Sequence, residues 1–105
     1  MDLSGKTVEF DVKPINSQSF FALATEQQGV AELAEFIYIG FDSADDAKGW
    51  SCRPTGAGWY RVTVDIDKAF PNHKTKVFKF RIMISNQNQD QTQATSVYID
   101  NLKWN

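Results

Sequence analysis

The chain has 105 residues, a length typical of one domain, and 42% of them are hydrophobic while 23% are charged. A formal net charge of -2 gives no strong field that would attract nucleic acid or an anionic membrane. The N-terminal stretch lacks the basic and apolar regions of a signal peptide, and no apolar run is long enough to span a bilayer. We therefore expect a single domain over residues 1–105 that binds neither nucleic acid nor membrane.

The first half of the chain predicts three strands. Strict alternation of apolar and polar residues predicts a half-buried strand over 6–13, and a short apolar run predicts its return at 19–24. Residues 25–34 fit either a loop or a short helix. The run EFIYIGF at 35–41 is β-branched and aromatic with little alternation, which predicts a strand buried on both faces.

The second half predicts further strands separated by polar segments. A polar connection at 42–49 precedes a glycine-rich turn, and alternation then returns at 59–66 and, most clearly, at 76–85. An amide-rich loop at 86–95 leads to the last strand at 96–104, which has the composition of a buried strand. Six or seven strands with little helix predict an all-β fold, an antiparallel β-sandwich or a barrel.

The usual catalytic and metal-binding motifs are absent from the sequence. It has one cysteine, Cys52, and one histidine, His73, and it contains no CxxC, HExxH, Walker A or GxGxxG motif. We expect Cys52 to fill an apolar gap, since free cysteine is usually buried, and His73 to lie in a solvated turn. The sequence therefore predicts a protein that is not an enzyme.

Three acidic residues lie close together in the polar connection. Asp42, Asp45 and Asp46 provide hard oxygen atoms of the kind that bind calcium, but their spacing is not that of an EF-hand loop. The sequence leaves two interpretations open, a solvated loop or a calcium site.

A tryptophan on the polar side of a strand suggests sugar binding. Trp59 shares its side of the 59–66 strand with Arg61, while Lys79 and Arg81 occupy the polar side of the next long strand. If these strands are neighbours, one sheet face offers a flat aromatic ring for stacking and charged donors for sugar hydroxyls. Trp50, beside a glycine, is either a second stacking platform or a core residue. The alternative for the strand residues is that Trp59 covers a sheet edge and the arginines form ion pairs with Glu9 or Asp65.

Four segments together resemble a known family. LSGKTVEFDVKP, GWYRVTVDI, KVFKFRIMISN and VYIDNLKW are similar to the later strands of the β-jelly-roll carbohydrate-binding modules of bacterial glycoside hydrolases. This resemblance implies a jelly-roll-like sandwich that binds a polysaccharide of the β-glucan, xylan or mannan class without catalysis. It also implies a secreted or cell-surface location as part of a larger protein. The alternative is a structural or protein-interaction domain without a sugar site.

The resemblance also gives a role to the Asp-Asn pair of the last strand. In such modules an acid at this position often holds a structural Ca²⁺ or caps neighbouring backbone, and here that acid is Asp100. Asn101 would then satisfy backbone groups where the strand bends, and the alternative is simple polar pairing at a β-bulge. Family members usually have strands before the LSGK segment. Their absence here predicts an exposed sheet edge, and the sequence leaves two resolutions open, a homo-oligomer that pairs through this edge or a compact variant of the sandwich.

Overall fold

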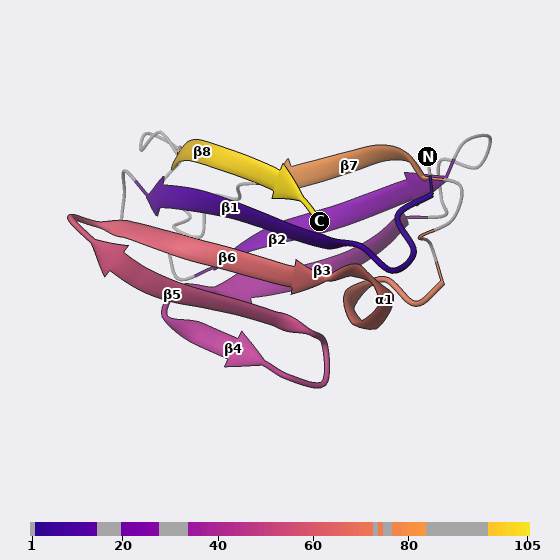
Figure 1. Ribbon diagram of the computed structural model, residues 1–105, viewed down its shortest axis with the longest axis horizontal. Coiled ribbons are helices and arrows are strands. Elements are labelled where there is room, and N and C mark those ends of the chain that lie inside the picture. Colours follow the sequence, from indigo (N-terminus) through magenta and orange to yellow (C-terminus); the bar gives the residue numbers. More distant parts are fainter. Residues whose placement is uncertain (1, 15–19, 28–33, 73, 75–76, 84–96) are drawn as a thin grey trace, which may run out of the picture.

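The computed structural model describes residues 2–14, 20–27, 34–72, 74, 77–83 and 97–105. These residues form two antiparallel sheets and one short helix, an all-β sandwich (Figure 1). The larger sheet has five strands in the order β4 (Ser43–Asp45), β5 (Trp50–Gly56), β6 (Trp59–Asp65), β1 (Thr7–Pro14) and β8 (Val97–Trp104). The smaller sheet has three strands in the order β3 (Ala34–Gly40), β2 (Phe20–Gln27) and β7 (Val77–Met83).

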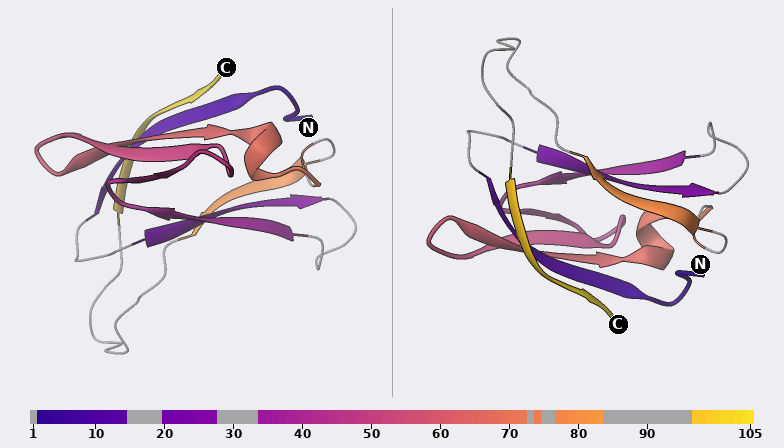
Figure 2. Two further views of the ribbon diagram at one scale, coloured as in Figure 1. Left: turned by 90° about the horizontal axis from the view of Figure 1, so that it is seen from below. Right: turned by 90° about the horizontal axis from the view of Figure 1, so that it is seen from above.

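The two sheets stack as separate layers, and the helix α1 (Ile66–Ala69) lies at one end of the sandwich (Figure 2). Along β1, β3 and β6, alternate residues are apolar and point into the space between the layers. Fifteen of these and neighbouring side chains form one buried core, which includes Val8, Phe10, Phe21, Leu23 and Val62. The alternation of apolar and polar residues in the sequence therefore places apolar side chains in a core between the two sheets.

Aromatic rings join the two sheets between inner strands and at one side. Phe10 of β1 packs edge-on against Phe21 of β2, with ring centroids 6.2 Å apart. At the β7–β8 side, Phe80 packs edge-on against Trp104, with centroids 5.2 Å apart. Such pairs add to the hydrophobic stabilisation of the core because the edge of one ring meets the electron-rich face of the other.

The prediction of an all-β sandwich is confirmed, and so are the apolar rows of β1 and β6. Four parts of the sequence interpretation were wrong. Residues 25–34 were expected to be a loop or a short helix, but β2 continues to Gln27 and β3 begins at Ala34. Residues 42–49 were expected to be a connection but contain strand β4, and β5 follows them. The 35–41 strand is not buried on both faces, because the described part of the chain covers only the side of β3 that faces the larger sheet. The last strand is also an exposed edge, with Leu102 51% exposed.

The two long alternating strands are not neighbours, which corrects the basis of the predicted sugar-binding face. β6 pairs with β1 and β5 in the larger sheet, whereas β7 pairs with β2 in the smaller one. Trp59 and Arg61 therefore lie in a different sheet from Arg81. A strand's own sequence shows which residues share a side, but it does not show which strand lies beside it.

The first and last strands pair with each other. The backbone N–H of Thr7 donates to the Asn105 carbonyl, and the N–H of Asn105 donates back to Thr7, both at 2.8 Å. Residue 105 therefore lies in the layer of the larger sheet, beside the start of β1.

Candidate functional site

The outer side of β3 carries two exposed aromatic rings. Phe36 is 45% exposed and Tyr38 is 64% exposed, while Ile37 and Ile39, which alternate with them, are buried in the core. Residues two apart on a strand lie on the same side, about 6.6 Å apart. Phe36 and Tyr38 therefore form a short row of rings along the edge of the smaller sheet.

Small residues lie beside these rings. Ala24 of β2 is paired with Phe36 on one side and with Arg81 of β7 on the other, and Ala22 is paired with Tyr38. Both alanines are buried although they are not part of the core cluster. The two alanines therefore form the low centre of this face, and larger side chains on the flanking strands shield them from solvent.

A charged pair completes the same face. Nη1 of Arg81 donates to Oε1 of Glu26 at 2.7 Å, and the Arg81 side chain is 42% exposed. A guanidinium carries five N–H donors in a rigid plane, so one ion pair does not use its full capacity. We name Ala22, Ala24, Phe36, Tyr38, Glu26 and Arg81 the aromatic face.

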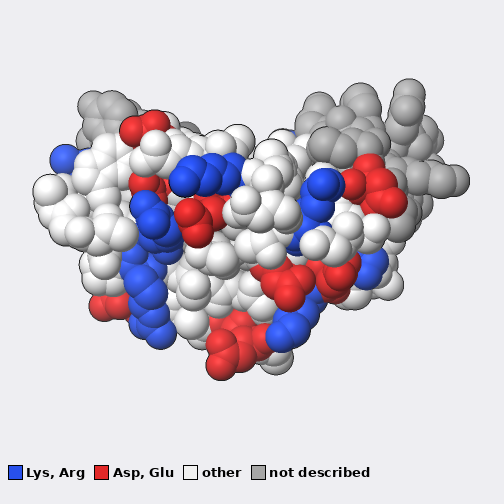
Figure 3. Space-filling view, in the orientation of Figure 1, with Lys and Arg blue, Asp and Glu red and all other residues white. Residues whose placement is uncertain are grey.

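The outer face of the larger sheet has a different chemistry. In Figure 3, which views this side, Lys and Arg side chains alternate with Asp and Glu side chains over the surface. Its most enclosed polar group is Asp11, which is 8% exposed. Nε of Arg61 donates to Oδ1 of Asp11 at 2.8 Å, and Nδ2 of Asn101 donates to Oδ2 at 2.7 Å. These two hydrogen bonds, with Arg61 first, lower the pKa of Asp11 below its ordinary value.

Asn101 occupies a β-bulge. Asp11 pairs with Asp100 and Glu9 pairs with Lys103, so β8 has one residue more than β1 between these pairs. Asn101 has φ +56°, a left-handed conformation that asparagine tolerates better than most residues. Asn101 therefore lies where the strand departs from regular backbone. Its side chain, however, donates to the Asp11 carboxylate, and this is the polar pairing at a bulge that the alternative interpretation described.

Trp59 lines a pocket of about 320 Å³ beside this network. The ring is half-buried, and the other lining residues are polar or small: Asp11, Thr55, Gly56, Asp100 and Asn101. Asp100 accepts a hydrogen bond from the backbone N–H of Asn101 at 2.8 Å. Much of the polar lining of this Trp59 pocket is thus already hydrogen-bonded within the protein.

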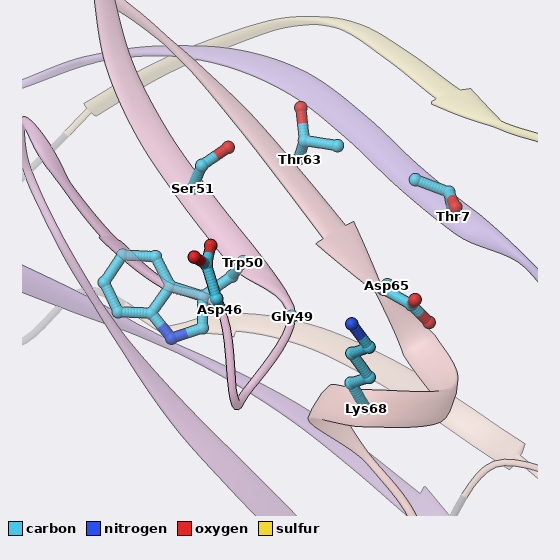
Figure 4. A pocket seen from close by; sticks show the side chains of 8 residues that line it. All are labelled: Thr7, Asp46, Gly49, Trp50, Ser51, Thr63, Asp65 and Lys68. Atoms are coloured by element: carbon cyan, nitrogen blue, oxygen red, sulfur yellow. The ribbon is translucent and has the colours of Figure 1, made fainter.

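A second pocket, of about 550 Å³, lies where α1 meets the larger sheet (Figure 4). Hydroxyls of Thr7, Thr63 and Ser51 come to it from the neighbouring strands β1, β6 and β5. Lys68 of α1 approaches Gly49 closely at this pocket, and only glycine permits this approach. Its φ is +74°, and a Cβ there would lie 2.7 Å from Cβ of Lys68. Trp50 also lines this pocket, but its side chain is buried in the core, so the pocket offers no exposed ring for stacking.

The predicted sugar-binding residues are spread over the molecule. Trp50 is 9% exposed and belongs to the core, as the core interpretation expected, so it is not an exposed platform. Trp59 and Arg61 lie on the outer face of the larger sheet, and Arg61 is held by Asp11, with Glu9 4.0 Å away. Arg81 lies on the aromatic face. Lys79 pairs with Glu26 in the strand register, and its side chain is outside the described residues.

The sequence reading missed Phe36 and Tyr38. The signal was present in the run FIYI, where aromatic residues alternate with isoleucines. Only the stacking of the two sheets separates the two kinds of residue, because it buries one side of β3 in the core and leaves the other side exposed.

The remaining candidate ligands and nucleophiles are separated. Cys52 is buried in the core, as predicted, and burial raises the pKa of its thiol to about 11. Asp42 forms an ion pair with Arg53 at 3.5 Å, and Asp45 accepts from the N–H of Lys48. Within the described residues, no three acidic, histidine or cysteine side chains are grouped as metal ligands. His73 lies outside these residues, and a calcium role for Asp100 stays a prediction.

Comparison with protein-family models, with curated proteins and with solved structures finds no match to this chain. The resemblance to carbohydrate-binding modules thus rests on the sequence segments alone. No helix in the described part of the chain is long and apolar enough to cross a membrane.

Proposed function

We propose that this chain is a non-catalytic carbohydrate-binding domain and that the aromatic face is its sugar-contacting surface. The observation that carries the proposal is the pair of exposed rings, Phe36 and Tyr38, beside a low alanine centre. Exposed apolar residues gathered on one face commonly mark an interaction site. The ligand class is a polysaccharide of the β-glucan, xylan or mannan type, encountered outside the cell by the larger protein that carries the domain.

The chemistry of the face fits such a ligand. A pyranose ring has an apolar C–H side that packs on an aromatic ring, and a rim of hydroxyls that need hydrogen-bond partners. Two rings in a row along β3 offer stacking to successive sugars of an extended chain. Arg81, which lies across the alanines from the rings, offers guanidinium donors to the hydroxyls, and its ion pair with Glu26 of β2 holds it on this face.

The Trp59 pocket is the second surface with an aromatic ring and polar groups. We expect it to contribute less, because Asp11 is already paired with Arg61 and Asn101. Stacking on Trp59 would also use a ring that is already half-buried.

Affinity electrophoresis against a panel of soluble polysaccharides tests the proposal. We expect the wild-type protein to be retarded in gels of one or two polysaccharides. Tyr38→Ala and Phe36→Ala should each weaken binding by up to about tenfold, since one ring contact contributes about 0.5–1.5 kcal/mol. The matched control is Trp59→Ala, which removes a ring from the other sheet and should have the smaller effect.

Two outcomes would overturn the proposal. Folded wild-type protein that is retarded by no polysaccharide removes the function, and loss of binding in Trp59→Ala alone moves the site to the larger sheet. Gels with chelator in place of calcium test the Asp100 prediction separately, because only a metal-dependent site loses affinity there.

The alternative function, a structural or protein-interaction domain, is favoured by a different observation. The edge strand β8 exposes three apolar side chains, Ile99 (43%), Leu102 (51%) and Trp104 (37%). Under this alternative, no polysaccharide retards the protein, and substitutions on β8 rather than on β3 abolish its association with a partner.

A further inference from the structure

Four strand edges end the two sheets, and three of them carry features that discourage pairing with another chain. Strand β4 has only three residues, and β8 is interrupted by the bulge at Asn101 and carries Lys103. Strand β7 carries Lys79 and Arg81. Short length, bulges and cationic residues are the common means by which proteins prevent edge-to-edge association.

Strand β3 has none of these features. It is seven residues long, from Ala34 to Gly40, and contains no lysine, arginine or proline. Its register with β2 runs without a bulge over the whole length. Its one charged residue, Glu35, lies near the start of the strand and accepts a hydrogen bond from the backbone N–H of Asn72 at 3.1 Å. The centre of the strand, Phe36 to Ile39, is apolar on both sides.

In the described part of the chain, β3 pairs with β2 alone and ends its sheet, and we propose that its outer edge pairs antiparallel with the same edge of a second copy of this chain. A two-fold axis at Ile37 brings all seven residues of each strand into register. Phe36 of one copy then lies opposite Tyr38 of the other, twice, and aromatic cross-strand pairs stabilise antiparallel sheets. Glu35 lies opposite Ile39, so no two like charges meet.

Pairing β7 with β7 of a second copy around a two-fold axis is unfavourable. A two-fold axis at Phe80 places Lys79 of one copy opposite Arg81 of the other, and like charges directly opposite destabilise a sheet. The self-complementary edge is therefore β3. The pair would form one six-stranded sheet from two three-stranded sheets, with isologous symmetry.

The contact is small. One seven-residue strand on each side buries less than the roughly 1,200 Å² of the smallest stable interfaces, so we expect a reversible dimer. A dissociation constant between about 1 µM and 1 mM corresponds to such a contact. The proposal concerns association without any sugar, so it stands or falls independently of polysaccharide binding.

Sedimentation velocity over a concentration series, in sugar-free buffer, tests the dimer with two variants of opposite charge. One carries Phe36→Lys with Tyr38→Lys, and the other carries Phe36→Glu with Tyr38→Glu. Each alone places like charges opposite at both aromatic positions and should raise the dissociation constant at least about tenfold. An equimolar mixture should restore the dimer, and salt should weaken the mixed dimer because its charges are exposed. The control, Leu102→Lys, changes an exposed residue of the β8 edge and should dimerise like the wild type.

Circular dichroism first shows that each variant is folded, and any one of four results then overturns the proposal. A wild-type protein that stays monomeric at about 1 mM overturns the proposal. So does a like-charged variant that dimerises as well as the wild type, a mixture of the two variants that remains monomeric, or a Leu102→Lys variant that has lost the dimer.

Discussion

On the outer face of the larger sheet, the Asp11 carboxylate is held by Arg61 and Asn101, whereas on the smaller sheet Phe36 and Tyr38 extend toward solvent beside alanines. Both faces come from the same alternation along their strands. The difference is that the polar groups of the first face are largely satisfied by one another, while the rings of the second face leave apolar area exposed. The first arrangement stabilises the fold, and the second is available for a ligand.

Removal of Asp11 should produce the largest effect on stability. Asp11→Ala leaves the Arg61 guanidinium and the Asn101 amide without their shared acceptor, and hydrogen bonds to charged groups contribute about 1.5–3 kcal/mol each. We expect the free energy of unfolding to fall by about 2–3 kcal/mol in urea titrations, with polysaccharide affinity unchanged. The matched control is Asp42→Ala, which breaks an ion pair with Arg53 whose two side chains are both exposed and should cost less than about 1 kcal/mol. Equal losses in the two variants would show that the hydrogen bonds of Asp11 contribute no more than an exposed ion pair.

The stabilisation by Asp11 should depend on pH in a defined direction. Hydrogen bonds from Arg61 and Asn101 hold its pKa in the folded state below the ordinary value of 3.8, so folding favours the ionised form. The contribution is complete above about pH 5 and decreases as the pH falls through the folded-state pKa. Urea titrations of the wild type and of Asp11→Asn should therefore converge as the pH is lowered from 5 to about 2.5. If the difference in unfolding free energy between the two proteins stays constant over this range, the stabilisation does not come from the charge of Asp11.

A substitution between the sheets should have the smallest effect and the opposite sign. Thr25 of β2 is fully buried, and its hydroxyl finds no hydrogen-bond partner in the described part of the protein. Thr25→Val keeps the shape and removes the buried polar atom, so we expect the free energy of unfolding to rise by about 1 kcal/mol. Polysaccharide affinity should not change, because the side chain points away from the aromatic face. A stabilised variant with altered affinity would show that the outer face responds to packing beneath it.

The inward rows of β1 and β6 could be predicted because their alternation is strict, and Val8, Val62 and Val64 are indeed fully buried. The unusual backbone of Asn101 could be anticipated because an amide tolerates a left-handed conformation. The aromatic face could not, since the exposure of Phe36 depends on which side of β3 the larger sheet covers, and this is a property of the whole fold. The pairing of Arg61 with Asp11 depends in the same way on the register between β6 and β1, in which these two residues lie opposite.

The mutual hydrogen bonds of Thr7 and Asn105 have a practical consequence for how the protein can be attached to a solid support. A tether joined to residue 105 leaves from the layer of the larger sheet, on the opposite side of the sandwich from Phe36 and Tyr38 (Figure 2). Anchored to a bead in this way, the protein turns its aromatic rings toward the solution. Under the proposed function, a dense coating would engage one long polysaccharide at many points, so that a weak single contact becomes strong retention through effective concentration.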